Sequence, residues 1–182
     1  MKRLPEPLRL RNGKTYTLRS AAPEDAGMLL QYLKDTCAET PYLSREPEEI
    51  TLTVQEEAAF LASQEQAPRA LMLTAFYEDK VAGNASFAPV GPSAREAHRC
   101  SAAIALYRAH CGQGLGKALF SRLLELAKAA GYTQAELSVV SENRPAIALY
   151  QKLGFVRCGI LPHAERYPDG HEAEMWLFVK RL

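Results

Sequence analysis

Hydrophobic and polar positions along this chain switch repeatedly between two periods, which predicts alternating strands and helices. Alternation every second residue, or a short apolar run, indicates strands at 15–19, 70–77, 81–87, 101–107, 135–139, 156–160 and 175–180. Apolar residues three and four apart indicate helices that begin near residues 23, 53, 118 and 145. Irregular segments are expected at 36–50 and 91–99, which are rich in proline and polar residues.

Two of these segments carry signals about their ends or surroundings. Thr53 and Glu56 have the spacing of a capping box, so the second helix should begin there, with Ala59, Phe60 and Leu61 on its apolar face. Residues 101–107 are apolar on both faces, as is typical of a central strand covered on both sides. Because no segment has the composition of a linker, we expect residues 1–182 to form a single α/β domain.

Composition and charge exclude several classes of partner. The chain has 182 residues, of which 47% are hydrophobic and 24% charged, with a formal net charge of +1. This balance predicts no nucleic-acid partner and no acidic membrane surface. No N-terminal apolar run or membrane-spanning stretch is present, so we expect a cytoplasmic protein. Cys37, Cys100, Cys111 and Cys158 lack C-x-x-C spacing, and we expect reduced, mostly buried thiols and no metal.

The most informative chemistry lies between the strand at 101–107 and the helix at 118–130. The connecting sequence is Cys111-Gly112-Gln113-Gly114-Leu115-Gly116-Lys117. A glycine-rich turn from a strand into a helix aims backbone N–H groups and a helix N-terminus at one point, which favours phosphate or pyrophosphate. The simpler alternative is that Gly114 and Gly116 only build a tight turn.

Two well-known phosphate loops do not fit this sequence. A P-loop needs glycine at 111 and a hydroxyl residue at 118, where Cys111 and Ala118 stand. The dinucleotide fingerprint needs glycine at 117, where Lys117 stands, and would lie nearer the start of its fold. A different nucleotide enzyme, such as a dehydrogenase or kinase, therefore remains only as a third alternative.

The loop resembles the acetyl-CoA loop of the GCN5-related N-acetyltransferases (the GNAT superfamily), whose pattern is Q/R-x-x-G-x-G/A. The chain continues with Leu137-Ser138-Val139, Asn143 and Ala146-Ile147-Ala148-Leu149-Tyr150-Gln151-Lys152-Leu153-Gly154-Phe155. This run is similar to the family's L-x-V…N…A-I-x-L-Y-x-K-x-G-F segment. The ending Tyr167-Pro168-Asp169-Gly170, followed by Met175, also resembles the end of many members.

This resemblance implies a fold and an activity. The fold would be a central mixed, mostly antiparallel twisted sheet with a splayed parallel strand pair, flanked by helices. The activity would be acetyl transfer from acetyl-CoA to a primary amine of a small molecule or protein, by direct attack in a ternary complex. One alternative is a catalytically weak acyl-CoA-binding or sensing protein of the same fold. Homodimers are common in the family, but no residue here establishes one.

The resemblance also implies roles for individual residues. The acetyl-CoA pyrophosphate would be held by Gly112, Gln113, Gly114, Leu115, Gly116 and Lys117. The pantetheine arm would lie along Ile104, Ala105 and Leu106 like an added strand, and a backbone N–H near Leu106 would face the thioester oxygen. Asn143, Ala146 and Tyr150 would also line the cofactor site; Asn143 would bond the arm and Tyr150 would protonate the departing thiolate.

Two of these residues have alternative roles, and a neighbouring loop position departs from the family pattern. Tyr150 could be an ordinary core residue, and Asn143 could cap the helix that follows it, although capping and ligand contact can coexist. Cys111 departs from the family pattern, which has Gln or Arg there. We expect weaker anchoring of the cofactor as a result, with Lys117 as a compensating charge.

The general base is not identified by the sequence. An amine must lose a proton before it attacks, and many members keep a glutamate for this purpose. The two usual positions hold Ser101 and Ser138, which cannot act as bases near neutral pH. The other candidates are His98, Glu142, His163 and Glu165, each of which could simply be solvated; ordered water is a further route.

The architecture that the resemblance implies would bring the acceptor to two acidic segments, residues 36–50 with the preceding Asp35, and the closing loop at 162–172. Their carboxylates belong to Asp35, Glu39, Glu46, Glu48, Glu49, Glu165, Asp169 and Glu172. Clustered acids suit a cationic acceptor, such as a polyamine, an aminoglycoside or a protein amino group, while a solvated acidic surface is the alternative.

Overall fold

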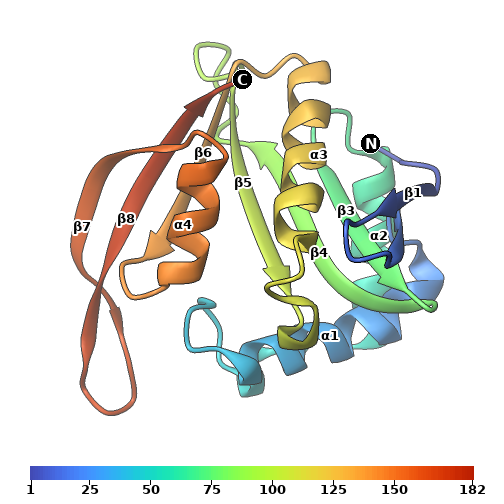
Figure 1. The fold of residues 1–182 in the computed structure, drawn as a ribbon, viewed down its shortest axis with the longest axis horizontal. Helices are drawn as coiled ribbons and strands as arrows, with labels where there is room; N and C mark the ends of the chain where they lie inside the picture. The colour runs from blue at the N-terminus through green and yellow to red at the C-terminus, as the bar shows by residue number, and fades with distance from the viewer. The chain divides into compact units, whose positions relative to one another are not determined.

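The computed structural model describes residues Met1 to Leu182 and contains four α-helices and eight strands. The helices are α1 (Ala26–Glu39), α2 (Val54–Gln66), α3 (Leu115–Ala129) and α4 (Arg144–Lys152). The strands are β1 (Glu6–Arg9), β2 (Thr15–Arg19), β3 (Leu71–Tyr77), β4 (Lys80–Pro89), β5 (Arg99–Leu106), β6 (Gln134–Val140), β7 (Val156–Arg166) and β8 (Glu172–Arg181). Their order is β1-β2-β3-β4-β5-β6-β8-β7, mostly antiparallel, with β5 and β6 parallel (Figure 1). The predicted fold class is confirmed.

The chain divides into two compact units. The first unit comprises Met1–Ala88 and Ala103–Leu123, and the second comprises Pro89–Ala102 and Leu124–Leu182. That the chain acts as one domain stays a prediction. None of the helices combines the length and apolar composition that crossing a bilayer requires. No group of three His, Cys, Asp or Glu side chains is arranged to hold a metal ion.

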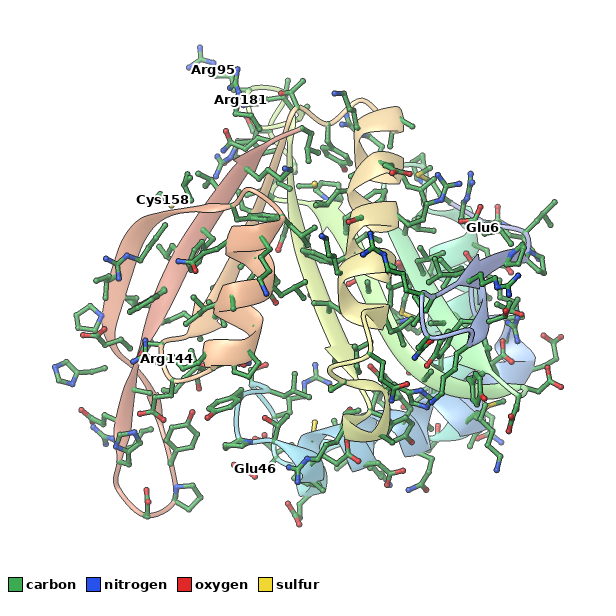
Figure 2. All side chains as sticks on the ribbon, viewed as in Figure 1. Glu6, Glu46, Arg95, Arg144, Cys158 and Arg181 are labelled. Carbon is green, nitrogen blue, oxygen red and sulfur yellow. The ribbon has the colours of Figure 1, made fainter.

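The first unit is built on antiparallel strands and the helices α1 and α2. Strand β2 alternates as predicted, because Tyr16 and Leu18 are buried while the residues beside them are not. Leu29 of α1, Leu61 of α2 and Phe76 of β3 belong to one buried apolar cluster. This cluster fixes both helices against the strands by burial of apolar surface. Glu6 of β1 also accepts hydrogen bonds from Arg122 of α3 at 2.7 and 2.8 Å (Figure 2).

An ion pair and a capping box fix the starts of α1 and α2. Arg19, at the end of β2, donates to both carboxylate oxygens of Asp25 at 2.5 and 3.0 Å, and the N–H of Ala22 donates to Asp25 at 2.7 Å. The hydrogen bond from Arg19 lowers the pKa of the buried Asp25 carboxyl. The capping box is confirmed, since the N–H of Thr53 donates to Glu56 and the N–H of Glu56 donates to Thr53 Oγ1.

The second unit packs α4 against β6 and β8. Leu137 and Val139 of β6 are buried as predicted, and the ring of Tyr150 in α4 lies 6.4 Å from that of Phe178 in β8. Strands β7 and β8 form a long antiparallel hairpin (Figure 1).

A charged side chain makes a favourable contact at each end of α4. Lys180 Nζ donates to the carbonyl of Leu153 at 2.5 Å, where α4 ends. At the opposite end, the Arg144 guanidinium lies 5.9 Å from the centroid of the Trp176 ring (Figure 2). Cations near the final carbonyl of a helix and over an indole ring are both favourable.

Several predicted element boundaries are wrong. Strand β1 precedes the strand at 15–19 and was not predicted, because four residues that include Pro7 show no clear alternation. Helix α1 continues to Glu39, into the segment expected to be irregular. Strand β7 runs to Arg166 and β8 begins at Glu172, so most of the expected closing loop is strand.

Burial also differs from the prediction. In β5, Cys100 and Ala102 are buried but Ser101 and Ala103 are exposed, so this strand is not covered on both faces. Small residues are compatible with either environment, which is why the apolar run misleads. On α2, Ala59 and Phe60 are exposed, and two of the four thiols, Cys111 and Cys158, are exposed rather than buried.

Candidate active site

The glycine loop joins the end of β5 to the start of α3 through a sharp turn. A short 3-10 turn at Arg108–His110 comes first, and Gly112 and Gly114 then adopt φ angles of +73° and +93°. A Cβ atom at either glycine would meet no heavy atom within 4 Å. Glycine is therefore required there by backbone conformation, and open space surrounds the turn.

The start of α3 leaves backbone N–H groups without helical hydrogen bonds. The N–H of Ala118 donates to the carbonyl of Gly114 at 3.1 Å, which closes the first turn of the helix. The N–H groups of Leu115, Gly116 and Lys117 precede that bond and have no partner within the helix. Leu115 is fully buried and anchors the turn, while the Lys117 side chain is exposed. The arrangement is suited to binding an anion.

Two side chains of the loop are used to hold its shape. Gln113 Nε2 donates to the carbonyl of Ala109 at 2.6 Å. The Cys111 thiol lies 3.5 Å from the carbonyl of Tyr107, and partial desolvation of the sulfur together with the nearby Glu39 carboxylate raises its pKa. Cys111 is thus a neutral thiol near pH 7, and it brings no positive charge to the loop.

The remaining predicted cofactor residues lie on α4 in the second unit. Asn143 is the N-cap of α4, since its Oδ1 accepts the N–H of Ala146 at 3.2 Å. Its capping role is confirmed, and ligand contact through the Nδ2 amide stays a prediction. Tyr150 lies two turns further along the same helix and is only 6% exposed.

Burial sets the chemistry of Tyr150. Its ring lies 6.0 Å from that of Phe155 and 6.4 Å from that of Phe178. Burial raises the pKa of the phenol to about 12. The hydroxyl therefore stays protonated at any working pH and can donate a hydrogen bond, as the predicted acid role requires.

The two serines and the four candidate general bases fall into three groups. Ser101 and Ser138 are exposed on β5 and β6, where a hydroxyl offers no basic group. His163 and Glu142 are paired with other side chains: His163 Nδ1 lies 2.7 Å from Glu172, and His171 Nε2 lies 2.6 Å from Glu142. Neither His98 nor Glu165 makes a side-chain hydrogen bond that would orient it as a base.

The twelve predicted site residues thus occupy two places in the chain. Nine of them form the end of β5, the glycine loop and the first residues of α3, all in the first unit. The other three, Asn143, Ala146 and Tyr150, share α4 in the second unit.

Residues 29–155 match the acetyltransferase (GNAT) family. The chain belongs to this family. The match includes the glycine loop and α4, so the two places that the sequence singles out both lie inside it.

Known proteins extend this GNAT assignment. The chain is 35% identical over 83 residues to human N-acetyltransferase 8B, a match that covers 45% of this chain and 37% of that protein. The chain thus spans little more than a third of that relative's length. The structure matches the GNAT-family acetyltransferase from Streptococcus pneumoniae with a TM-score of 0.87 and 28% identity, covering 92% and 99% of the two chains.

A third comparison shows the fold alone. The GNAT-superfamily phosphinothricin acetyltransferase from Sinorhizobium meliloti, solved in complex with acetyl-CoA, matches with a TM-score of 0.79 and 21% identity. That match covers 92% of this chain and 88% of the other.

Many of the acids expected to meet the acceptor of this GNAT protein are engaged in internal contacts. Glu39 accepts the backbone N–H of Arg108 at 2.7 Å, and Asp35 accepts the hydroxyl of Tyr107 at 2.8 Å. Glu46 and Glu49 cap a short 3-10 turn. Glu172 pairs with Arg166 at 2.6 Å. These carboxylates have structural roles, which weakens the argument from acidic clusters to a cationic acceptor.

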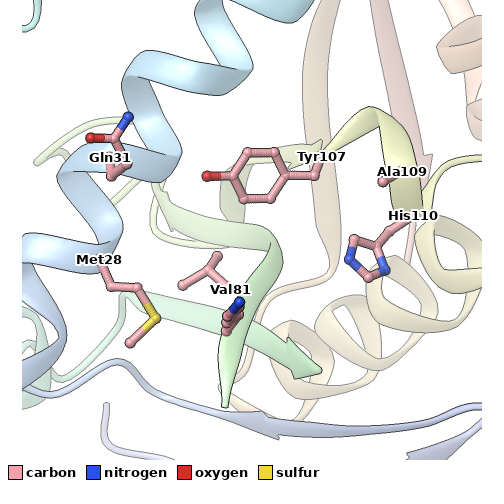
Figure 3. A pocket seen from close by; sticks show the side chains of 7 residues that line it. Met28, Gln31, Val81, Tyr107, Ala109 and His110 are labelled. Carbon is pink, nitrogen blue, oxygen red and sulfur yellow. The ribbon is translucent and has the colours of Figure 1, made fainter. Parts of the chain in front are cut away.

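A shallow pocket lies beside the loop, and no sequence signal predicted it. Its volume is about 440 Å³, and its lining residues are Met28, Gln31, Lys80, Val81, Tyr107, Ala109 and His110 (Figure 3). It contains none of the predicted cofactor residues. His110 Nδ1 lies 3.0 Å from the hydroxyl of the buried Tyr16, and burial lowers the pKa of this histidine.

Proposed function

We propose that this GNAT protein is an N-acetyltransferase that transfers the acetyl group of acetyl-CoA to a primary amine. The loop between β5 and α3 carries the proposal, because two glycines at positive φ stand in open space before the N-terminus of a long helix. That geometry fits a pyrophosphate, and it occurs in a chain of an acetyltransferase family. A relative solved with acetyl-CoA supports the same co-substrate.

The residues that would hold acetyl-CoA supply mainly backbone groups. Residues 112–117 would bind the pyrophosphate through their N–H groups, with the Lys117 ammonium adding charge. The side chain of Gln113 is already bonded to Ala109, so its contribution would come from the main chain. The edge of β5 at residues 104–106 would bind the pantetheine arm as an added strand does.

The proposed reaction is a direct attack. When bound, acetyl-CoA supplies an acetyl thioester, whose thiol has a pKa near ~8.5 and is a tolerable leaving group. The amine nitrogen forms a bond to the carbonyl carbon, the carbon–sulfur bond breaks, and the amine loses one proton. The products are an acetamide and the free thiol. The N–H of Leu106 would stabilise the charge that develops on the carbonyl oxygen. Tyr150 would donate its proton to the sulfur and regain one from water, which in turn takes the proton that the amine loses.

The route by which the amine loses its proton is inferred from the residues at the family's usual base positions. With serine at 101 and 138, no carboxylate at the family's usual positions takes the amine proton. We propose that the proton leaves through water, so turnover should increase with pH toward the pKa of the acceptor amine. A small-molecule or protein amine is proposed as the partner, in a cytoplasmic protein with a homodimer as one possible assembly.

Thiol release with a panel of amines tests this function. Wild-type protein should release CoA thiol from acetyl-CoA in the presence of at least one amine, and Tyr150→Phe should lower kcat by roughly 10- to 100-fold with nearly unchanged acetyl-CoA affinity. Tyr132→Phe removes the hydroxyl of another buried tyrosine in the same unit and should leave turnover unchanged. Unchanged turnover in Tyr150→Phe would remove Tyr150 from the mechanism.

Binding of acetyl-CoA without thiol release from any amine would favour the second candidate. That candidate is a catalytically weak acyl-CoA-binding or sensing protein. The observations that support it are the neutral Cys111 in the loop and the two serines in place of acids.

A further inference from the structure

The hydroxyl of Tyr32 in α1 bonds to both β4 and β5 at one position. The N–H of Tyr107 donates directly to the carbonyl of Ala82 at 3.1 Å. Two residues further along each strand, Asn84 and Ala105 stand where the next antiparallel bond would form. At this position the Tyr32 hydroxyl donates to the carbonyl of Ala105 at 2.8 Å and accepts the backbone N–H of Asn84. The hydroxyl therefore links the two strands here.

Tyr32 is held firmly in this place. It is 2% exposed, it belongs to the apolar cluster of the first unit, and its ring lies edge-on to that of Tyr107 with centroids 5.2 Å apart. Burial raises the pKa of its phenol well above the ordinary value, so the hydroxyl remains a donor. A buried hydroxyl with both a donor and an acceptor partner is costly to displace.

The approach of β4 to the same peptide is equally tight. A Cβ atom on Gly83 would lie 2.1 Å from Cδ2 of Leu106, 3.0 Å from the carbonyl oxygen of Ala105 and 3.3 Å from the Cα of Leu106. Gly83 therefore allows β4 to pass closely beside the Ala105–Leu106 peptide. The peptide is fixed from two directions, by α1 and by β4.

Fixing the Ala105 carbonyl also fixes the N–H of Leu106. In a trans peptide the carbonyl of one residue and the N–H of the next point in opposite directions, and the chain contains no cis peptide. Because the Ala105 carbonyl points toward Tyr32 and β4, the Leu106 N–H points to the other edge of β5. This is the N–H group proposed to bond the thioester oxygen.

We infer that Tyr32 is a positioning residue for acetyl transfer, which orients the Leu106 N–H through the Ala105 carbonyl. The inference rests on the proposed function. Without the hydroxyl, Asn84 and Ala105 can bond directly, and the peptide rotates toward β4. A displacement near 1 Å of a group that contacts the reacting atoms costs about 100-fold in rate.

Helix α1 makes two more hydrogen bonds with residues that follow Leu106, one to a side chain and one to the backbone. Asp35 accepts the Tyr107 hydroxyl at 2.8 Å, and Glu39 accepts the Arg108 N–H at 2.7 Å. Positions 32, 35 and 39 lie on one face of a helix. The three contacts involve the carbonyl of Ala105, the hydroxyl of Tyr107 and the N–H of Arg108.

Tyr32→Phe tests the inference. We expect kcat to fall roughly 10- to 100-fold while the acetyl-CoA dissociation constant changes less than about threefold, because the glycine loop is untouched. Tyr16→Phe, which removes the hydroxyl of an equally buried tyrosine on β2, is the matched control and should keep kcat within about twofold. A fall in kcat of equal size in both variants would show a merely structural effect and overturn the inference.

A spectroscopic measurement reads the proposed hydrogen bond directly. The infrared carbonyl stretch of acetyl-CoA, labelled with ¹³C at the carbonyl, should shift to lower frequency on binding wild-type protein, and less on binding Tyr32→Phe. Gly83→Ala, whose methyl group would meet the Leu106 side chain and the Ala105 carbonyl, should displace the same peptide and reduce the shift as well, which gives a second variant if Tyr32→Phe folds poorly.

The outcomes separate this inference from the proposed function. Wild-type protein that neither binds acetyl-CoA nor releases thiol would overturn the function. Active wild-type protein whose Tyr32→Phe variant keeps both kcat and the carbonyl shift would overturn only the role of Tyr32.

Discussion

Tyr150 shows how burial selects one chemical role for a side chain and excludes others. With its pKa raised to about 12, the phenol cannot serve as a base near neutral pH, yet it remains a hydrogen-bond donor. The same burial explains why Tyr150 also packs against Phe155 and Phe178. Tyr150 is thus a core residue and also the proposed acid, and the turnover of Tyr150→Phe tests the acid role.

Cys111 offers a second test at the residue scale. Replacing this neutral thiol by arginine places a cation where the family pattern has Gln or Arg, beside a loop suited to an anion. We expect Cys111→Arg to tighten acetyl-CoA binding roughly three- to tenfold, the factor that about 1 kcal/mol provides. Isothermal titration calorimetry measures the dissociation constant.

The exposed Cys158 on β7 supplies a control with the same change in charge. Cys158→Arg should leave the dissociation constant unchanged. Equal affinities in wild-type protein and Cys111→Arg would show that the loop holds the pyrophosphate without a side-chain charge at this position.

At the scale of the elements, the start of α1 depends on the Arg19–Asp25 pair. The hydrogen bond from Arg19 lowers the pKa of Asp25 below its ordinary 3.8, so the carboxylate stabilises the fold above that pH. This stabilisation is lost as the pH falls through the lowered, folded-state pKa. Asp25→Asn should therefore cost about 1–2 kcal/mol of unfolding free energy at pH 7 and less at pH 3.

Urea unfolding at the two pH values checks this prediction. Glu24→Gln changes an exposed acid beside Asp25 and should have an effect within about 0.5 kcal/mol at both. A cost for Asp25→Asn that is the same at pH 3 and pH 7 would mean that ionisation of Asp25 does not contribute.

Periodicity predicted the elements well where burial follows a regular pattern. Strand β2 alternates clearly, the β3–β4 hairpin consists of two apolar runs around a short turn, and α4 has both a cap at Asn143 and a stop after Lys152, so their positions were predictable. Strand β1 was not predictable, because it is short and contains Pro7. It is a strand because it pairs with β2, and its own four residues do not indicate that pairing. Pairing between strands is a property of the folded chain.

Only some of the functional residues were predictable from the sequence. The glycine loop was predictable because a positive φ restricts the residue type to glycine at Gly112 and Gly114. Tyr32 was not, because on an apolar helix face a tyrosine looks like any core residue. Gly83 within a strand gave no sign of the close approach of β5. Contacts between elements decide both roles.

For the whole molecule, the family is established by comparison with known proteins, whereas the function of the site is proposed. Residues 29–155 match the acetyltransferase (GNAT) family, and the mixed sheet with its one parallel pair matches solved members. The co-substrate and the acceptor of this chain are proposals that rest on its loop geometry. Binding of acetyl-CoA is the claim on which every other proposal depends.

A thermal-unfolding scan with acetyl-CoA, and with NAD and ATP as controls, tests that claim most directly. A ligand at 100 times its dissociation constant stabilises a protein by about 2.7 kcal/mol, which corresponds to a Tm increase of roughly 5–10 °C in a chain of this size. We predict an increase of that order with acetyl-CoA alone. No increase with acetyl-CoA, or a larger one with NAD or ATP, would contradict the account.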